Sequence, residues 1–111
     1  MQKLNLTITY LNKYKFNLYT YEAPYYEKSG IYIVGVLNND KSKFSLKYIG
    51  KTDDLSNRGM DNHNNIKCFK DNNCNCLGFL EINSSKDRTE IEEELIKTQK
   101  PNCNILLNPN K

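Results

Sequence analysis

Four side chains in this sequence are of the types that hydrolysis of a phosphodiester bond requires. Two are tyrosines in apolar runs, and the others are an arginine in a polar stretch and a glutamate in an amphipathic segment: Tyr32, Tyr48, Arg58 and Glu92. A carboxylate gives Mg²⁺ a hard oxygen ligand, and a guanidinium presents a planar fork that matches phosphate oxygens. A phenol can act as a general base when neighbouring positive charge lowers its pKa. Plainer uses stay open, because strand tyrosines pack in cores and surface arginines form ion pairs.

Arginine is rare in this chain, which makes its positions informative. Of the 16 basic residues only Arg58 and Arg88 are arginines, and the others are lysines. Lysine, asparagine, isoleucine and tyrosine are abundant, and their codons are rich in A and T. The composition therefore indicates an AT-rich bacterial, phage or mobile-element genome, in which a cluster of lysines is only a weak sign of anion binding.

The four residues also have a specific spacing. A Gly-Ile-Tyr tripeptide ends at Tyr32, a Tyr-Ile-Gly tripeptide begins at Tyr48, and Arg58 follows Tyr48 by ten residues. Glu92 precedes Asn104 by twelve residues, with a Leu-Ile pair and a proline between them. In these motifs and intervals the sequence resembles the GIY-YIG nuclease family.

The resemblance covers roughly residues 28–107 and implies a role for each matching position. It implies that Tyr32 or Tyr48 is the general base and that both are catalytic. Arg58 would hold the phosphate, and Glu92 would bind Mg²⁺ or Mn²⁺. The implied activity is that of a divalent-metal-dependent endonuclease acting on DNA, with no small-molecule substrate.

Three further residues of the motifs are expected to support the site. Gly30 and Gly50 are expected to be structural residues near it. Asn104 is expected to be a structural hydrogen-bonding residue that braces the end of the Glu92 helix.

Three lysines are candidates for contacts with nucleic acid. Lys51, directly after the second tripeptide, is expected to contact phosphate or to help ionise a tyrosine. Lys47 and Lys67 are expected to contribute to a basic face beside Arg58.

The single histidine of the chain departs from the family spacing. Many relatives carry a histidine four residues after the arginine, whereas His63 follows Arg58 by five. On a continuous helix one extra residue rotates a side chain by ~100°. A catalytic role and a solvent-facing role for His63 therefore both stay open.

Two other functions compete with the nuclease. One is a catalytically inactive module of the same fold that binds nucleic acid or another partner, but retention of the tyrosines, the arginine and the glutamate favours the enzyme. The other is a zinc-binding module made of His63, Cys68, Cys74 and Cys76. Their spacing matches none of the recognised zinc patterns, so free thiols are favoured.

Periodicity predicts the elements that would position these residues. Alternating or compact apolar runs predict strands over 4–10, 14–21, 31–37, 44–49 and 76–82. The expected fold is α+β, with a small, mainly antiparallel, three-stranded central sheet built from the last three runs and flanked by helices.

Two helices and one loop are expected around these strands. A helix is predicted from 53 or 54 to 62, with Leu55 and Met60 on its inner side, and the polar segment 64–75 is predicted to be a loop. A longer helix is expected from capping residues at 83–85 to Gln99.

Length and composition limit the remaining choices. The 111 residues fit one domain, with a strand-forming extension at 1–25 packed on a nuclease-like domain at 26–111. No apolar run is long enough to span a membrane, and neither a signal peptide nor a disulfide spacing is evident, so a cytoplasmic protein with reduced thiols is expected. A net charge of +3 is weakly basic, so tight DNA binding would need a homodimer or a targeting partner.

Overall fold

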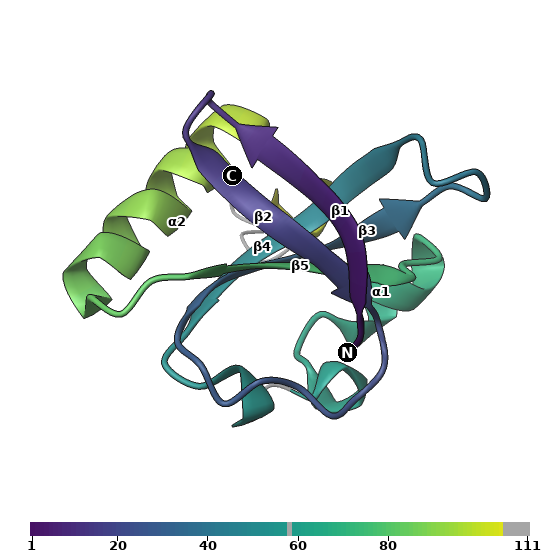
Figure 1. Ribbon diagram of the computed structural model, residues 1–111, viewed down its shortest axis with the longest axis horizontal. Helices are drawn as coiled ribbons and strands as arrows, with labels where there is room; N and C mark the ends of the chain where they lie inside the picture. The colour runs from purple at the N-terminus through teal and green to yellow at the C-terminus, as the bar shows by residue number, and fades with distance from the viewer. Residues whose placement is uncertain (58, 106–111) are drawn as a thin grey trace.

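A five-stranded antiparallel sheet with strand order β1-β2-β5-β3-β4 forms the centre of the protein (Figure 1). The computed structural model describes residues 1–57 and 59–105. The strands are β1 (Lys3–Tyr10), β2 (Tyr14–Thr20), β3 (Gly30–Leu37), β4 (Phe44–Thr52) and β5 (Cys76–Glu81). The helical elements are η1 (Leu55–Asn57), η2 (Met60–Asn62), α1 (Ile66–Asp71), α2 (Ser85–Gln99) and α3 (Asn102–Ile105).

The predicted α+β class is confirmed, but the sheet is larger than expected. The three predicted central strands are present as β3, β4 and β5. The N-terminal strands β1 and β2 join the same sheet, because β2 pairs with the free side of β5. The first 25 residues therefore extend the sheet, so β5 lies at its centre and not at its edge.

Alternation along β3 divides the core between the two faces of the sheet. Tyr32 and Val34 belong to one buried cluster, on what we name the first face. Ile31 and Ile33 belong to a second cluster, on the second face. A strand whose side chains are buried on both faces reads as a continuous apolar run, as residues 31–37 do in this sequence.

Different helical elements cover the two faces. Leu55, Met60 and Phe69, from the segment between β4 and β5, pack on the first face and are buried. The predicted inward positions of Leu55 and Met60 are therefore confirmed. Leu95 of α2 packs on the second face, where α2 lies against β4 and β3.

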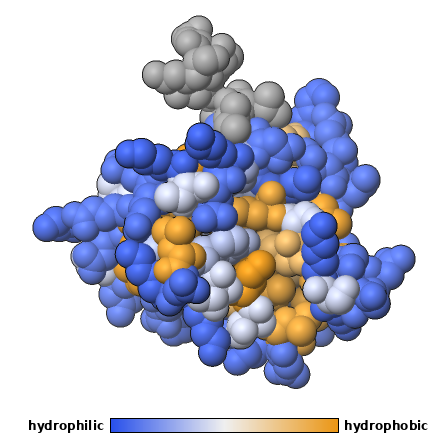
Figure 2. Space-filling view, turned by 90° about the horizontal axis from the view of Figure 1, so that it is seen from above, coloured by the Kyte–Doolittle hydropathy of each residue, from blue (hydrophilic) through white to orange (hydrophobic). Residues whose placement is uncertain are grey.

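Part of the second face stays exposed. Apolar side chains of β1 and of the β3–β4 hairpin pack against its cluster and are only partly buried: Leu4, Leu6, Ile8, Leu37 and Phe44. Figure 2 shows a main apolar area to the right of the centre and a smaller one to the left, on an otherwise mostly hydrophilic exterior. In the part of the chain that the structure describes, no helix is long and apolar enough to cross a membrane.

The helix predicted over 53–62 is wrong. The segment forms two short 3-10 turns, η1 and η2. Gly59 between them has an extended backbone, with φ −59° and ψ 123°. The Asp54 side chain accepts a hydrogen bond from the Ser56 backbone N–H (3.0 Å). Short polar side chains that bond to nearby backbone groups favour turns over a continuous helix.

The loop predicted over 64–75 is also wrong in part, because α1 forms inside it. Ile66 and Phe69 lie three residues apart and so share one side of this short helix, and Phe69 is buried. Asparagines flank the segment on both sides and conceal this pattern in the sequence. The second predicted helix is confirmed as α2, whose N-cap Ser84 accepts a hydrogen bond from the Asp87 N–H (3.2 Å).

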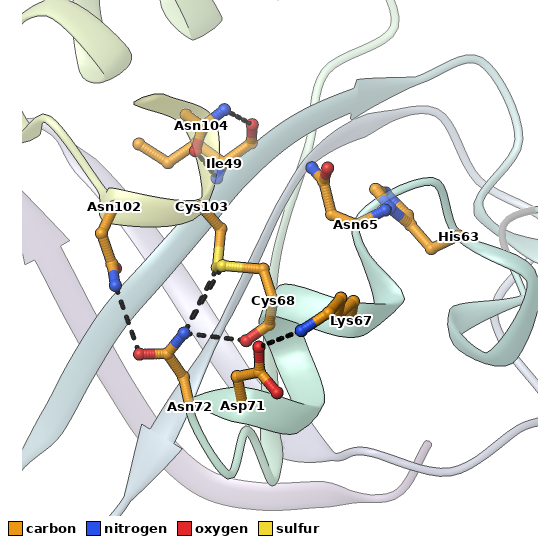
Figure 3. The surroundings of a disulfide bond; sticks show 10 residues. All are labelled: Ile49, His63, Asn65, Lys67, Cys68, Asp71, Asn72, Asn102, Cys103 and Asn104. Atoms are coloured by element: carbon orange, nitrogen blue, oxygen red, sulfur yellow. Dashed lines mark hydrogen bonds and ion pairs between the residues drawn. A yellow bond between two sulfur atoms is a disulfide. The ribbon is translucent and has the colours of Figure 1, made fainter. Parts of the chain in front are cut away.

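The expectation of four reduced thiols is wrong. Cys68 of α1 and Cys103 of α3 form a disulfide, with their Cα atoms 5.8 Å apart (Figure 3). The two residues are 35 positions apart in the sequence, so only the tertiary fold brings them together. The amide nitrogen of Asn72 donates to the Cys68 carbonyl oxygen (2.8 Å) and lies 3.8 Å from the Cys103 sulfur.

The zinc alternative also fails. Cys68 forms the disulfide, so its sulfur is not available to bind zinc. Cys76 belongs to the second-face cluster and His63 contacts the first face, so the sheet separates these two residues. Burial raises the pKa of Cys74 to about 11, so its thiol stays protonated at neutral pH. Among the described residues, no group of three or more His, Cys, Asp or Glu is arranged to hold a metal.

The disulfide should contribute substantially to stability. In the chain-entropy model, closing a loop of this length is worth about 4 kcal/mol, and Cys68→Ser should lower the free energy of unfolding by up to that amount. Urea denaturation measures this difference. A thiol reductant should destabilise the wild type and leave Cys68→Ser unchanged. Equal midpoints for the oxidised wild type and Cys68→Ser would contradict a stabilising cross-link.

Candidate active site

The two motif tyrosines lie on the first face, on neighbouring strands. In the β3–β4 register Tyr32 is opposite Gly50, and Tyr48 is opposite Val34. The two rings are therefore diagonal neighbours, with centroids 5.9 Å apart. Tyr32 is 2% exposed and Tyr48 is 9% exposed. Both are core residues as well as candidate catalytic residues, so the two interpretations of these tyrosines do not exclude one another.

The motif glycines provide space. A Cβ atom at Gly50 would lie 2.4 Å from Cζ of Tyr32 and 2.5 Å from its hydroxyl oxygen. The Tyr32 ring therefore occupies the volume of the missing side chain. A Cβ atom at Gly30 would lie 2.1 Å from the carbonyl oxygen of Leu80 on β5. Both glycines allow a close approach that any larger residue would prevent.

His63 joins the two tyrosines from the segment between η2 and α1. Its Nε2 atom lies 2.7 Å from the hydroxyl oxygen of Tyr32. Its ring packs edge-on against Tyr48, with centroids 5.0 Å apart, and its centroid is 4.9 Å from that of Phe69. His63 follows η2 with extended backbone, so the rotation argument for a continuous helix does not apply to it.

A backbone hydrogen bond fixes the protonation pattern of His63. The Asn65 backbone N–H donates to Nδ1 of His63 (3.0 Å). A neutral imidazole has one donor and one acceptor nitrogen, so Nε2 carries the proton. His63 therefore donates to the Tyr32 oxygen, which leaves the Tyr32 hydroxyl proton to be directed elsewhere.

Asn104 braces β4 at the position next to Tyr48. Its side-chain oxygen accepts from the Ile49 N–H (2.7 Å), and its side-chain nitrogen donates to the Ile49 carbonyl (2.8 Å; Figure 3). β4 is the edge strand of the sheet formed by the described residues, and the Asn104 amide bonds to backbone groups on its outer side. Asn104 thus makes structural hydrogen bonds to β4, whereas the sequence predicted that it braces the end of the Glu92 helix.

The disulfide connects the two segments that support the group formed by Tyr32, Tyr48 and His63. Cys103 is the neighbour of Asn104, and Cys68 lies on the helix that follows His63 and Asn65. Figure 3 shows these residues in one compact region. The segment that carries His63 and the segment that braces Tyr48 are therefore covalently joined.

Glu92 lies on α2, which Lys51 ties to the sheet. The Lys51 ammonium donates to the Thr89 hydroxyl (2.9 Å), and Glu92 lies on the next turn of α2 and is half-buried. The structure thus places the helix of Glu92 against β4, the strand that carries Tyr48.

The other two predicted lysines lie in different surroundings. Lys47 is the extra residue where the register shifts, because Val34 pairs with Tyr48 and Gly35 with Leu46. Lys67 is exposed and forms an ion pair with Asp71 within α1 (3.0 Å).

The second arginine of the chain has a structural role, and the first lies outside the described residues. Arg88 is buried, and its guanidinium donates to the carbonyl oxygens of Ile82 (2.9 Å) and Asn83 (3.0 Å). It thereby fastens the start of α2 to the end of β5. The predicted phosphate contact, Arg58, is not among the residues that the structure describes.

A cleft of ≈ 220 Å³ opens beside Tyr48 and His63, and amide side chains dominate its lining. The lining residues are Tyr48, Asn57, Gly59, Asn62, His63, Asn64 and Asn65. Asn65 and Phe69 contact His63 but have no signal in the sequence, because each contact depends on the fold of α1.

A family model agrees with this geometry. The model of the GIY-YIG catalytic domain matches residues 28–104, and the chain belongs to this family of nucleases. The match begins after β2, so the first two strands lie outside it. No curated protein and no solved structure matches the chain.

Gly50→Ala should disturb the site by displacing Tyr32. The added methyl group would overlap the phenol ring, and forced overpacking typically costs 1–3 kcal/mol of stability. Chemical denaturation measures this loss, and displacement of the hydroxyl should change the His63 ring signals in NMR spectra. Gly59→Ala is the control for stability, because its Cβ would meet only the Asn62 amide at 3.8 Å. Equal stability of both variants would contradict the close packing.

Proposed function

We propose that this protein is a divalent-metal-dependent endonuclease that hydrolyses DNA phosphodiester bonds at the cleft beside Tyr32, Tyr48 and His63. The observation that carries the proposal is the hydrogen bond between His63 and Tyr32, within a cluster that lies on the matched catalytic domain. This hydrogen bond also satisfies two partly buried polar groups, so it is compatible with packing, and what favours a catalytic role is its position at the two motif strands beside the cleft.

Tyr32 is the better candidate for the general base. A hydrogen bond donated to the oxygen of a phenol stabilises its ionised form and lowers its pKa. His63 donates to Tyr32, because the Asn65 backbone N–H occupies Nδ1. We propose that Tyr32 acts as a phenolate, which the hydrogen bond donated by His63 stabilises, and that it becomes a neutral phenol when it takes a proton from the attacking water.

Arg58 and Lys51 are proposed to bind the phosphate. Developing negative charge on the phosphoryl oxygens is stabilised by positive groups held in place before the reaction. Lys51 is positioned at the junction of β4 and α2 by Thr89. Lys47 and Lys67 are proposed to extend this contact along the DNA backbone.

A metal ion held by Glu92 fits the residues present. Mg²⁺ or Mn²⁺ is commonly bound by one or two carboxylates together with waters and substrate phosphates, and it stabilises the leaving oxygen. Glu92 is half-buried and lies on a helix packed against β4. The described residues offer no cluster of three ligands, so Glu92 would hold the ion together with the substrate.

The net charge of +3 gives little long-range attraction for DNA. We propose that tight binding depends on a second copy of the chain or on a targeting partner. The competing function is an inactive DNA-binding or interaction module of the same fold, and the cleavage assay separates the two.

Glu92→Gln and Arg58→Ala should each abolish cleavage without unfolding the protein. Removing one preorganised charge at the transition state costs roughly 10²–10³-fold in rate. Plasmid nicking with and without Mg²⁺ or Mn²⁺ measures the activity. Glu93→Gln is the matched control, because Glu93 is the exposed neighbour on the same helix. A wild type that binds DNA but never nicks it would support the inactive module, and full activity of Glu92→Gln would exclude the proposed metal ligand.

Tyr32→Phe should impair cleavage more than His63→Ala. Loss of the base costs roughly 10²–10⁴-fold, whereas loss of one supporting hydrogen bond costs about 10-fold. Single-turnover rates with saturating enzyme separate these effects from binding. Tyr14→Phe is the control, because Tyr14 packs against the second-face cluster. If His63→Ala lost as much activity as Tyr32→Phe, the base would have to be reassigned.

A further inference from the structure

Asn65 occupies the N-cap of α1 without capping it. Asparagine is among the best N-cap residues, because its side-chain oxygen can accept from the free N–H groups of the first turn. The Asn65 side chain makes no such hydrogen bond. Figure 3 shows its amide pointing away from α1. The usual reason for an asparagine at this position therefore does not apply here.

The Asn65 amide is also buried without a partner. The residue is 7% exposed, and its side-chain nitrogen is fully buried with no hydrogen bond to any described residue. An unsatisfied buried amide destabilises a protein. Asn72, at the opposite end of the same helix, differs in this respect, because its amide bonds to Cys68 and Asn102.

The position of Asn65 in the site offers a reason why a buried amide that reduces stability is present here. Asn65 lines the cleft together with Tyr48 and His63, and its backbone N–H holds the His63 ring. A half turn about its last side-chain torsion exchanges the amide oxygen and nitrogen, and this torsion has a broad, roughly two-fold energy profile. Asn65 can therefore present an N–H donor to a ligand in the cleft.

We propose that the Asn65 amide is a substrate-binding group that donates a hydrogen bond to a non-bridging phosphate oxygen of the DNA strand in the cleft. This inference rests on the proposed function for the identity of the ligand. A phosphate oxygen is favoured over a base edge because Asn65 lines the same cleft as His63 and Tyr48, where the reacting backbone of the DNA is proposed to lie. A neutral donor at this point supplements the few arginines of the chain.

The test compares the two asparagines of α1 by stability and by affinity. Asn65→Ala and Asn72→Ala are each made in the wild type and in Glu92→Gln. Thermal unfolding gives Tm, and titration of several duplexes of different sequence in Ca²⁺ gives Kd for the Glu92→Gln forms. Asn65→Ala should leave Tm unchanged or raise it, and should weaken the affinity for every duplex by roughly 10- to 100-fold. Asn72→Ala should lower Tm and change Kd by less than about twofold.

Each contrary result has a definite meaning. A fall in Tm with unchanged Kd for Asn65→Ala would make Asn65 a structural residue and overturn the inference. A loss of affinity confined to certain sequences would indicate a base contact and overturn the phosphate assignment. Absence of any duplex binding by Glu92→Gln would also overturn it. If the wild type did not cleave DNA but Asn65→Ala still weakened binding as expected, the proposed nuclease activity would fail while this inference would stand.

Discussion

The hydrogen bond between His63 and Tyr32 depends on most of the first face of the sheet. It requires the Tyr32 ring to lie over Gly50, which is possible only because that position has no side chain. It also requires the His63 ring to be held from its other nitrogen by the Asn65 N–H. The β3–β4 register sets the first condition, and the turn into α1 sets the second. A small error in either would separate the two groups, because a hydrogen bond weakens steeply with poor geometry.

Covalent and polar links keep these two conditions compatible. The segment between β4 and β5 carries His63 but is made of short helical turns, which have little stability of their own. The disulfide fastens this segment to α3, and Asn104 fastens α3 to β4 beside Tyr48. The site is therefore supported by a series of links: Asn104 joins β4 to α3, the disulfide joins α3 to α1, and His63, just before α1, bonds to Tyr32.

Much of the fold was predictable from local patterns, whereas the supports of the site were not. Periodicity and capping residues predict the strands and α2, and the Gly-Ile-Tyr and Tyr-Ile-Gly tripeptides identify the two motif tyrosines. Two contacts join residues that are far apart in the sequence, namely the pairing between β2 and β5 and the disulfide. No local sequence pattern predicts either of them. The analysis of His63 by helical rotation failed because Gly59 interrupts the expected helix. Nothing in the sequence distinguishes Asn65 from the other 16 asparagines, because its special feature is a buried amide nitrogen with no hydrogen-bond partner among the described residues.

The alternation of side chains along the strands separates stability from chemistry. The second face is built from aliphatic and aromatic residues such as Ile31, Ile33 and Leu95, which supply apolar burial with few polar groups to satisfy. The first face contains tyrosines and contacts His63, whose polar atoms must be paired or leave a cost. Adjacent residues of β3 thus have different roles: Ile31 points to the second face and adds to the apolar core, whereas Tyr32 points to the first face and belongs to the site. The division is not complete, because the buried hydroxyl of Tyr10, packed against the second-face cluster, also has no hydrogen-bond partner among the described residues. A buried polar atom without a partner therefore does not mark the site by itself, and what distinguishes Asn65 is its place in the lining of the cleft beside His63 and Tyr48.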